Sequence, residues 1–181
     1  MSAPNSTPSL SPIGIIGSLW AIAGLFVLFG NAIWRLSLRA VEAISSGLGA
    51  VEWSVLAVWV GFMAYSEGYK GFQKSFSPRT AARIHHLATS PNLLRTLLAP
   101  IFAMGFFHAD RRTRIVAYVL TFGIVVLILL IRYLPQPWRG IIDAGVVVGL
   151  SWGIVSLAIF IFRALVRGKP DASPCVPREE S

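Results

Sequence analysis

Residues 13–33 read IGIIGSLWAIAGLFVLFGNAI, a run of 21 residues that holds no charged side chain. An α-helix of that length extends about 31 Å, which matches the hydrocarbon thickness of a bilayer. Ser11 and Pro12 precede the run and are typical of a helix start, because proline suits the first helical position. We therefore expect a membrane-spanning helix here, continuing past the run to about Glu42.

Three more apolar runs follow, over residues 48–66, 115–131 and 144–162. Glu52 is the only charged residue in the first of these, and a turn that contains Pro135 and Pro137 separates the last two. Each run is long enough, or nearly so, to cross a bilayer as a helix. The sequence thus predicts an all-α integral membrane protein with a bundle of four transmembrane helices.

The composition indicates the same class of protein. Charged residues make up 13% and hydrophobic residues 55% of the chain, with a mean hydropathy of +0.67. A soluble domain has about 25% charged residues, so this composition argues against one. The single cysteine, Cys175, stands in a polar segment, which excludes a disulfide framework and a paired-cysteine metal site.

The basic residues predict the orientation. Twelve of the sixteen Lys and Arg residues lie on one side of the four runs; the other side has only Arg35, Arg39, Arg132 and Arg139. Because basic residues are retained in the cytoplasm, we expect both termini there. A fifth span over 93–109 would change the division to about nine and six, so 78–109 is expected to form short cytoplasmic helices, interfacial or re-entrant, between the second and third spans.

The two ends of the chain are polar and rich in proline. Residues 1–10 and 168–181 are therefore predicted to be disordered tails that flank a membrane domain of residues 11–167.

Small residues predict where helices pack. In the second run six of them recur at spacings of three and four, each within about 40° of one common direction on an α-helix: Ala50, Ser54, Ala57, Gly61, Ala64 and Gly68. The fourth run has a GxxxGxxxG pattern at Gly145, Gly149 and Gly153. Such surfaces allow close approach of a second helix, either within the bundle or from a partner subunit.

Two carboxylates are candidates for an ion or proton site. Glu52 lies inside the second run, and Asp143 lies in the first turn of the fourth helix. Ionisable groups at membrane depth are often functional. The alternative is structural, with Glu52 pairing with Arg35 or Arg39 at the interface and Asp143 pairing with Arg139.

The loop after the second run combines aromatic and basic residues. Its members are Tyr69, Lys70, Phe72, Lys74, Phe76, Arg79 and Arg83. This combination suits a helix in the headgroup layer that contacts anionic lipid or a partner. The same residue types could bind RNA or a nucleotide, but a loop tethered between spans favours lipid, and no nucleic-acid partner is expected.

No residue pattern indicates catalysis, a metal or a cofactor. His85 and His86 are adjacent and His108 stands alone, without the spacing of a zinc site or of a bis-histidine haem within the spans. The expected function is therefore non-catalytic, as an oligomerising, accessory or assembly subunit of a membrane complex. The alternatives are a small transporter or channel that uses Glu52 or Asp143 and, less favoured, a haem-binding redox protein.

Two stretches carry a resemblance to a family. Residues 67–72 (EGYKGF) with 77–79 (SPR), and residues 134–140 (LPQPWRG), resemble those of small uncharacterised bacterial inner-membrane proteins with four spans. The resemblance covers about the last two-thirds of the chain. It implies a multi-pass protein of the bacterial inner membrane and no known activity.

Overall fold

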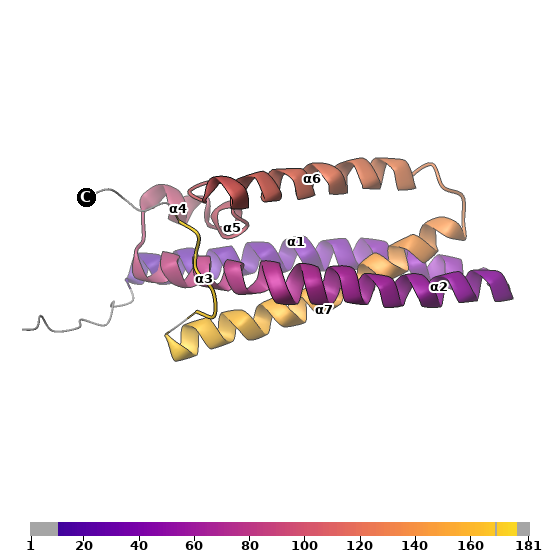
Figure 1. The fold of residues 1–181 in the computed structure, drawn as a ribbon, viewed down its shortest axis with the longest axis horizontal. Coiled ribbons are helices and arrows are strands. Elements are labelled where there is room, and N and C mark those ends of the chain that lie inside the picture. Colours follow the sequence, from indigo (N-terminus) through magenta and orange to yellow (C-terminus); the bar gives the residue numbers. More distant parts are fainter. Residues whose placement is uncertain (1–10, 169, 177–181) are drawn as a thin grey trace, which may run out of the picture.

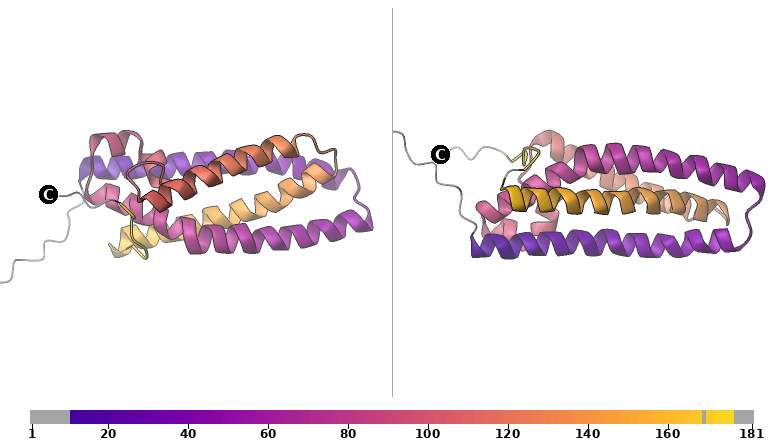
Figure 2. Two further views of the ribbon diagram at one scale, coloured as in Figure 1. Left: turned by 45° about the horizontal axis from the view of Figure 1, so that its top comes forward. Right: turned by 90° about the horizontal axis from the view of Figure 1, so that it is seen from below.

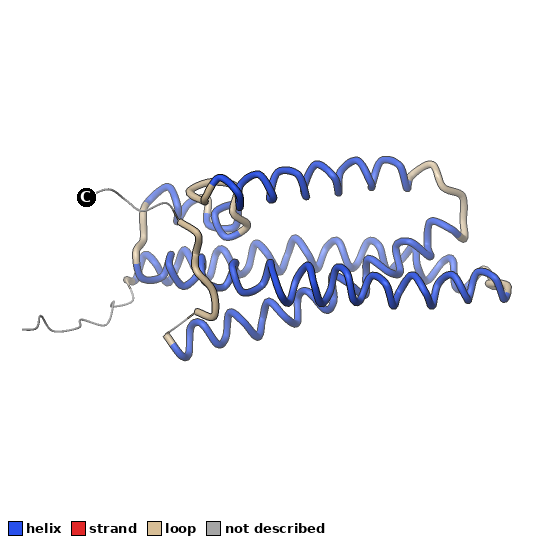
Figure 3. Tube along the Cα trace, viewed as in Figure 1, coloured by secondary structure: helices blue, strands red, loops and turns tan. Residues whose placement is uncertain are grey.

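The computed structural model describes residues 11–168 and 170–176, and within them every regular element is a helix (Figure 3). The all-α prediction is confirmed. The elements are α1 (Pro12–Ser45), α2 (Ala50–Met63), the π-helix η1 (Ala64–Phe76), α3 (Ser77–Thr89), α4 (Leu93–Leu97), α5 (Ala99–Ala103), α6 (Arg111–Ile131) and α7 (Trp138–Arg167).

The long helices run along one axis (Figure 1). α2, η1 and α3 follow one another without a break and form a single rod, which packs with α1 and α7. Figure 2 shows α7 lying between this rod and α1. α1 begins and α7 ends at the same end of the bundle, beside α3, α4 and α5. We call this the basic end and the opposite end the far end.

Among the described residues three helices are long and apolar enough to cross a membrane, namely α1, α6 and α7. The remaining predicted span, over residues 48–66, is not among them. α2 has only 14 residues before the backbone changes to the π-helix, whose sequence AYSEGYKGFQKSF is polar. The apolar run therefore ends inside a longer rod and does not coincide with one helix.

The π-helix also changes which residues share a face. Its hydrogen bonds join residues five apart, whereas those of an α-helix join residues four apart. The predicted stripe assumes α-helical geometry as far as Gly68, but the change begins at Ala64. Gly68 consequently turns towards α7 and is buried, while Ala50, Ser54, Ala57 and Gly61 are exposed.

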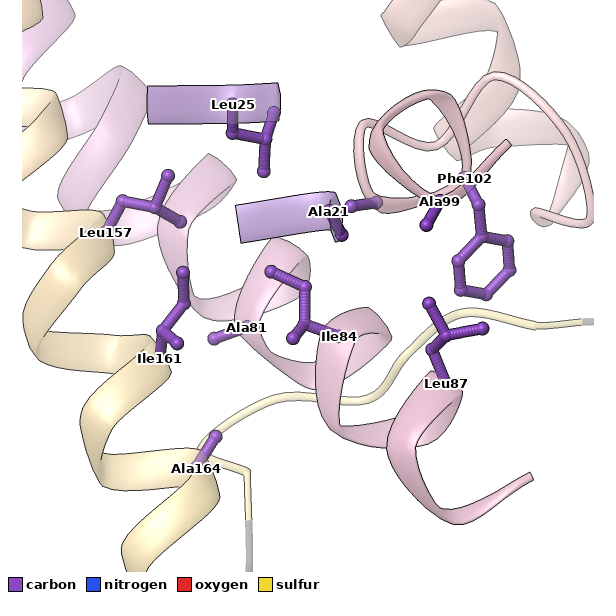
Figure 4. Packing of buried hydrophobic residues seen from close by; sticks show 11 residues of the cluster. Ala21, Leu25, Ala81, Ile84, Leu87, Ala99, Phe102, Leu157, Ile161 and Ala164 are labelled. Carbon is purple, nitrogen blue, oxygen red and sulfur yellow. The ribbon is translucent and has the colours of Figure 1, made fainter. Parts of the chain in front are cut away.

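The main apolar core lies near the basic end (Figure 4). Its central side chains include Leu25 of α1, Ile84 of α3, Phe102 of α5 and Leu157 of α7. α3 is mostly buried in this core, so most of its surface is covered by the rest of the molecule. Close approach explains the burial: Gly14 of α1 lies directly against the carbonyl of Ala88.

Two further segments lie at the basic end. Residues 93–109 form two five-residue helices and a loop, and neither helix is long enough to cross a membrane. Part of the predicted disordered tail is held in place, because the Arg83 guanidinium donates to the Pro174 carbonyl and the Asp110 N–H donates to the Cys175 carbonyl. Residues 1–10, 169 and 177–181 lie outside the described residues.

α6 stands apart from the other long helices (Figure 1). No residue in its most apolar stretch, which is long enough to cross a membrane, is buried in the molecule. Among the described residues α6 makes almost no contact with another helix. Its contacts are with the loop that leads to it, such as the edge-to-face pair of Phe106 and Tyr118.

Candidate functional site

A groove of about 650 Å³ runs along the exposed side of α7. Its wall is mostly apolar, with valine, isoleucine and phenylalanine side chains of α7. Its polar members are Gln73 of η1 and Ser151, Ser156 and Arg163 of α7. No acidic side chain from residues 11–168 or 170–176 lines it. The groove is therefore an apolar surface with a cation at the end nearer the basic end of the bundle.

Trp152 forms a fixed part of the groove wall. Its indole lies flat against Gly68, where a Cβ would be 2.9 Å from the indole Cγ. Its Nε1–H donates a 2.8 Å hydrogen bond to Oε1 of Gln73. Gly68 and Gln73 are five residues apart, so the π-helix brings both to the same side chain.

Ser156 places a buried hydroxyl at the groove. The residue is 5% exposed, and its Oγ makes no hydrogen bond to any residue in the described part of the chain. An unpaired buried polar group costs about 1–3 kcal/mol. A ligand in the groove that accepts a hydrogen bond would remove this cost.

Arg163 is exposed at the basic end of the groove. Its guanidinium carbon lies 5.9 Å from the ring centroid of Phe160, three residues earlier in α7. The side chain thus points back along the helix towards Ser156, as helical side chains do. The guanidinium can still donate hydrogen bonds to an anion in the groove mouth.

The predicted packing glycines of α7 all lie against the rod. A Cβ at Gly145 would be 2.5 Å from the Trp59 indole, one at Gly149 would be 2.9 Å from the Glu67 carboxylate, and one at Gly153 would be 2.5 Å from the Phe72 ring. The glycine pattern therefore receives large side chains of the same molecule.

The small residues of the rod are used differently. Gly68 packs against Trp152, but nothing among the described residues lies within 4 Å of the position that a Cβ would take at Gly61. Ala50, Ser54 and Ala57 are exposed as well. Four of the six predicted packing positions are thus not covered within the molecule.

The basic aromatic residues divide into two faces. Lys70 lies over the ring of Tyr65 at 5.0 Å, and Lys74 over that of Tyr69 at 5.4 Å, both on the outer surface. Phe72 and Phe76 instead pack edge-to-face with Phe29 of α1 and point inwards. The predicted continuous surface is therefore split, because η1 and α3 pack against α1 and α7.

Arg83 is a correction to the predicted contact surface, since it is only 1% exposed. Its guanidinium donates to the carbonyls of Phe102, Phe107, His108 and Pro174 and lies 4.1 Å from the Phe102 ring centroid. Burial lowers the pKa of Arg83 to about 10, so it is cationic at neutral pH. Arg83 joins α3 to α5 and the C-terminal segment and is not available to lipid. Arg79, by contrast, is half-buried and bonds within its own turn to Ser75.

The two candidate carboxylates lie towards the far end. Glu52 is half-buried in the first turn of α2, with its carboxylate close to Gly49. Asp143 is 4% exposed. The ion pair that forms near them joins Arg39 to Glu42 at 3.6 Å, and neither Glu52 nor Asp143 forms one with a described residue. The ion pairs predicted for these two carboxylates are therefore not formed.

The histidines do not form a common site. His85 and His86 lie on α3, whereas His108 lies in the loop before α6 with a positive φ of 45°. Within residues 11–168 and 170–176 there is no group of three or more His, Cys, Asp or Glu that could hold a metal ion.

The groove residues Gln73, Trp152, Ser156 and Arg163 were not predicted as a site. A signal existed, because Ser151, Trp152 and Ser156 are polar or amphipathic residues inside the apolar run that Arg163 closes. What could not be seen was Gln73, which reaches Trp152 only through the π-helix.

The long apolar helices define a helical membrane protein. No family model and no solved structure matches the chain. It is similar to the transmembrane protein 144 homolog A of Dictyostelium discoideum, with 35% identity over 65 residues. The match covers 35% of this chain and 15% of that relative. The relative is a eukaryotic protein, so it lends no support to a bacterial origin.

Proposed function

We propose that the chain crosses the membrane four times. In addition to α1, α6 and α7, α2 and the first turn of η1 together form a span, which is the second in chain order. Three observations support this. The rod, α1 and α7 pack together, α1 and α7 run in opposite directions, and both described ends lie at the basic end. An even number of crossings satisfies this arrangement, and the positive-inside rule would place both ends in the cytoplasm. Reporter fusions after residues 45, 90, 112 and 136 test it: signals that do not alternate as four spans require would reject it.

We propose further that the protein is a non-catalytic subunit that assembles through the exposed face of α2. The carrying observation is that the α7 glycines are covered by the rod, whereas Ala50, Ser54, Ala57 and Gly61 are not covered. Small residues on a lipid-exposed helix allow a second helix to approach its backbone closely. The partner is a second copy or another membrane subunit.

The outer face of η1 adds a contact to anionic headgroups. Tyr69, Lys70 and Lys74 lie on this face, and the two lysines are stacked on tyrosine rings. Basic side chains near a membrane surface each contribute about 1 kcal/mol of attraction to anionic lipid. Arg79 is at the same end of the rod and can join them.

A matched pair of glycines tests the assembly proposal. Gly61 and Gly30 both have open space where a Cβ would stand, but only Gly61 lies in the stripe of α2. We expect Gly61→Leu to lower the mass of the protein complex in mild detergent and to reduce energy transfer between labelled copies in liposomes. Gly30→Leu should leave both unchanged. A wild-type protein that is a lone monomer, with nothing co-purifying, would overturn the proposal.

A transporter or channel is the second candidate, because Asp143 is a buried carboxylate without an ion pair among the described residues. A pathway carboxylate would need this kind of environment. Flux assays in liposomes on wild type and Asp143→Asn test it. No proton or cation flux in the wild type removes this candidate.

A further inference from the structure

The groove along α7 is long and narrow. Its lining extends from Val147 to Arg163, which corresponds to about 24 Å of helix. The groove holds about 650 Å³, which falls within the range of small-molecule sites. Its occupant is therefore a narrow molecule.

The chemistry of the groove changes along its length. The section from Val147 to Val155 is largely apolar, and the indole of Trp152 is held there by Gly68 and Gln73. Val147 to Phe160 corresponds to about 20 Å of helix, which exceeds the roughly 15 Å of one bilayer leaflet. A single acyl chain that enters from the basic end fits this section in polarity and in length.

Two polar groups lie at the mouth of the groove in a defined order. The Arg163 guanidinium lies at the level of Phe160, and Ser156 lies one helical turn deeper, about 6 Å away. A guanidinium offers a planar set of donors that suits a phosphate. The unpaired hydroxyl of Ser156 offers a donor to an ester carbonyl, which a phospholipid carries just below its phosphate.

We propose that this groove is a binding site for one anionic phospholipid. The phosphate is held by Arg163, an ester carbonyl accepts a hydrogen bond from Ser156, and one acyl chain lies along α7 as far as Val147. No acidic side chain of the described residues lines the groove beside the positive charge of Arg163, which favours a lipid with net negative charge. This site is separate from the lysine-bearing face of η1 and does not depend on assembly through α2.

Native mass spectrometry of the delipidated full-length protein in mild detergent tests the proposal. The probes are phosphatidylglycerol and phosphatidylcholine, added separately. We expect the wild type to retain about tenfold more phosphatidylglycerol than phosphatidylcholine when one lipid is bound per protein. Arg163→Gln should lower this retention about tenfold, as expected for loss of a charge-assisted hydrogen bond. Ser156→Ala should weaken both lipids by a smaller factor, because the ester is common to both.

Two further variants make the result decisive. Arg132→Gln removes an exposed basic residue that does not line the groove and lies at the far end of the bundle, so it should bind as the wild type does. Val155→Trp fills the groove from a position that is 60% exposed, and it should abolish retention of both lipids while the helical circular dichroism is kept. Equal phosphatidylglycerol binding by Arg163→Gln and wild type overturns the proposal. Unchanged lipid binding by Val155→Trp also overturns the proposal. Oleate is added as a third probe, and a wild-type protein that retains oleate but not phosphatidylglycerol overturns it as well.

Discussion

The ring of Phe72 packs directly on the backbone of Gly153, where a Cβ would stand 2.5 Å from the ring. The contact joins η1 to α7 near the middle of the bundle and leaves no room for any side chain at Gly153.

We therefore expect Gly153→Ala to destabilise the protein. The added methyl would push the Phe72 ring away, and such overpacking costs about 1–3 kcal/mol. Gly123→Ala is the control, because nothing described lies within 4 Å of a Cβ at that position of α6 and alanine favours the helix. Thermal unfolding in detergent, followed by circular dichroism, compares the two. A Gly153→Ala protein as stable as wild type would contradict the close contact between Phe72 and Gly153.

A second pair of variants compares two glycines of the small-residue stripe on α2 and η1. Gly68→Ala should lower the unfolding temperature, because the new Cβ would lie 2.9 Å from the Trp152 ring. Gly61→Ala should leave it unchanged or raise it slightly, because the surrounding space is open. Equal effects at the two glycines would show that Gly68 has not turned towards α7, and thus that the rod is α-helical throughout.

The stripe also shows how far the sequence alone could lead. Apolar runs and a glycine pattern were enough to predict an all-helical membrane protein and to select Gly145, Gly149 and Gly153 as packing positions. They could not reveal the π-helix, which packs against α7, since no local residue pattern specifies it. The contact of Gln73 with Trp152 was missed for that reason.

Arg83 could not be placed correctly from sequence for a related reason. An arginine among other basic residues indicates a surface, but four backbone carbonyls from three separate segments surround this one. Carbonyl acceptors carry no signature in the sequence, because every residue has one.

We expect Arg83→Lys to release the C-terminal segment. A lysine keeps the charge but cannot reach the carbonyls of Phe102 and Pro174 together, which should cost about 2–4 kcal/mol. Cys175 follows Pro174, so its labelling by a maleimide should become faster. Arg79→Lys is the control, because Arg79 bonds only within its own turn, to Ser75. Unaltered Cys175 labelling in Arg83→Lys would show that Arg83 does not hold the segment.

Acidification should destabilise the protein through His85. Burial lowers the pKa of His85 below its usual 6.5, so the unfolded chain binds a proton more readily than the folded chain does. Its contribution to stability is complete above pH 6.5 and is lost as the pH falls through that value and below the pKa of the folded state. Unfolding temperatures at pH 7.5 and pH 5 should therefore differ less in His85→Gln than in wild type. His108→Gln, at an exposed position, should keep the wild-type difference.

α6 is held by its two connections and hardly at all by its neighbours. Residues along it are therefore selected by the lipid around them, since almost no partner side chain in the molecule requires a particular shape. Substitutions among leucine, isoleucine, valine and phenylalanine should accumulate freely there while the glycines of α7 stay unchanged. Two long helices of one molecule are thus under different constraints, α6 from the surrounding lipid and α7 from its packing against the rod.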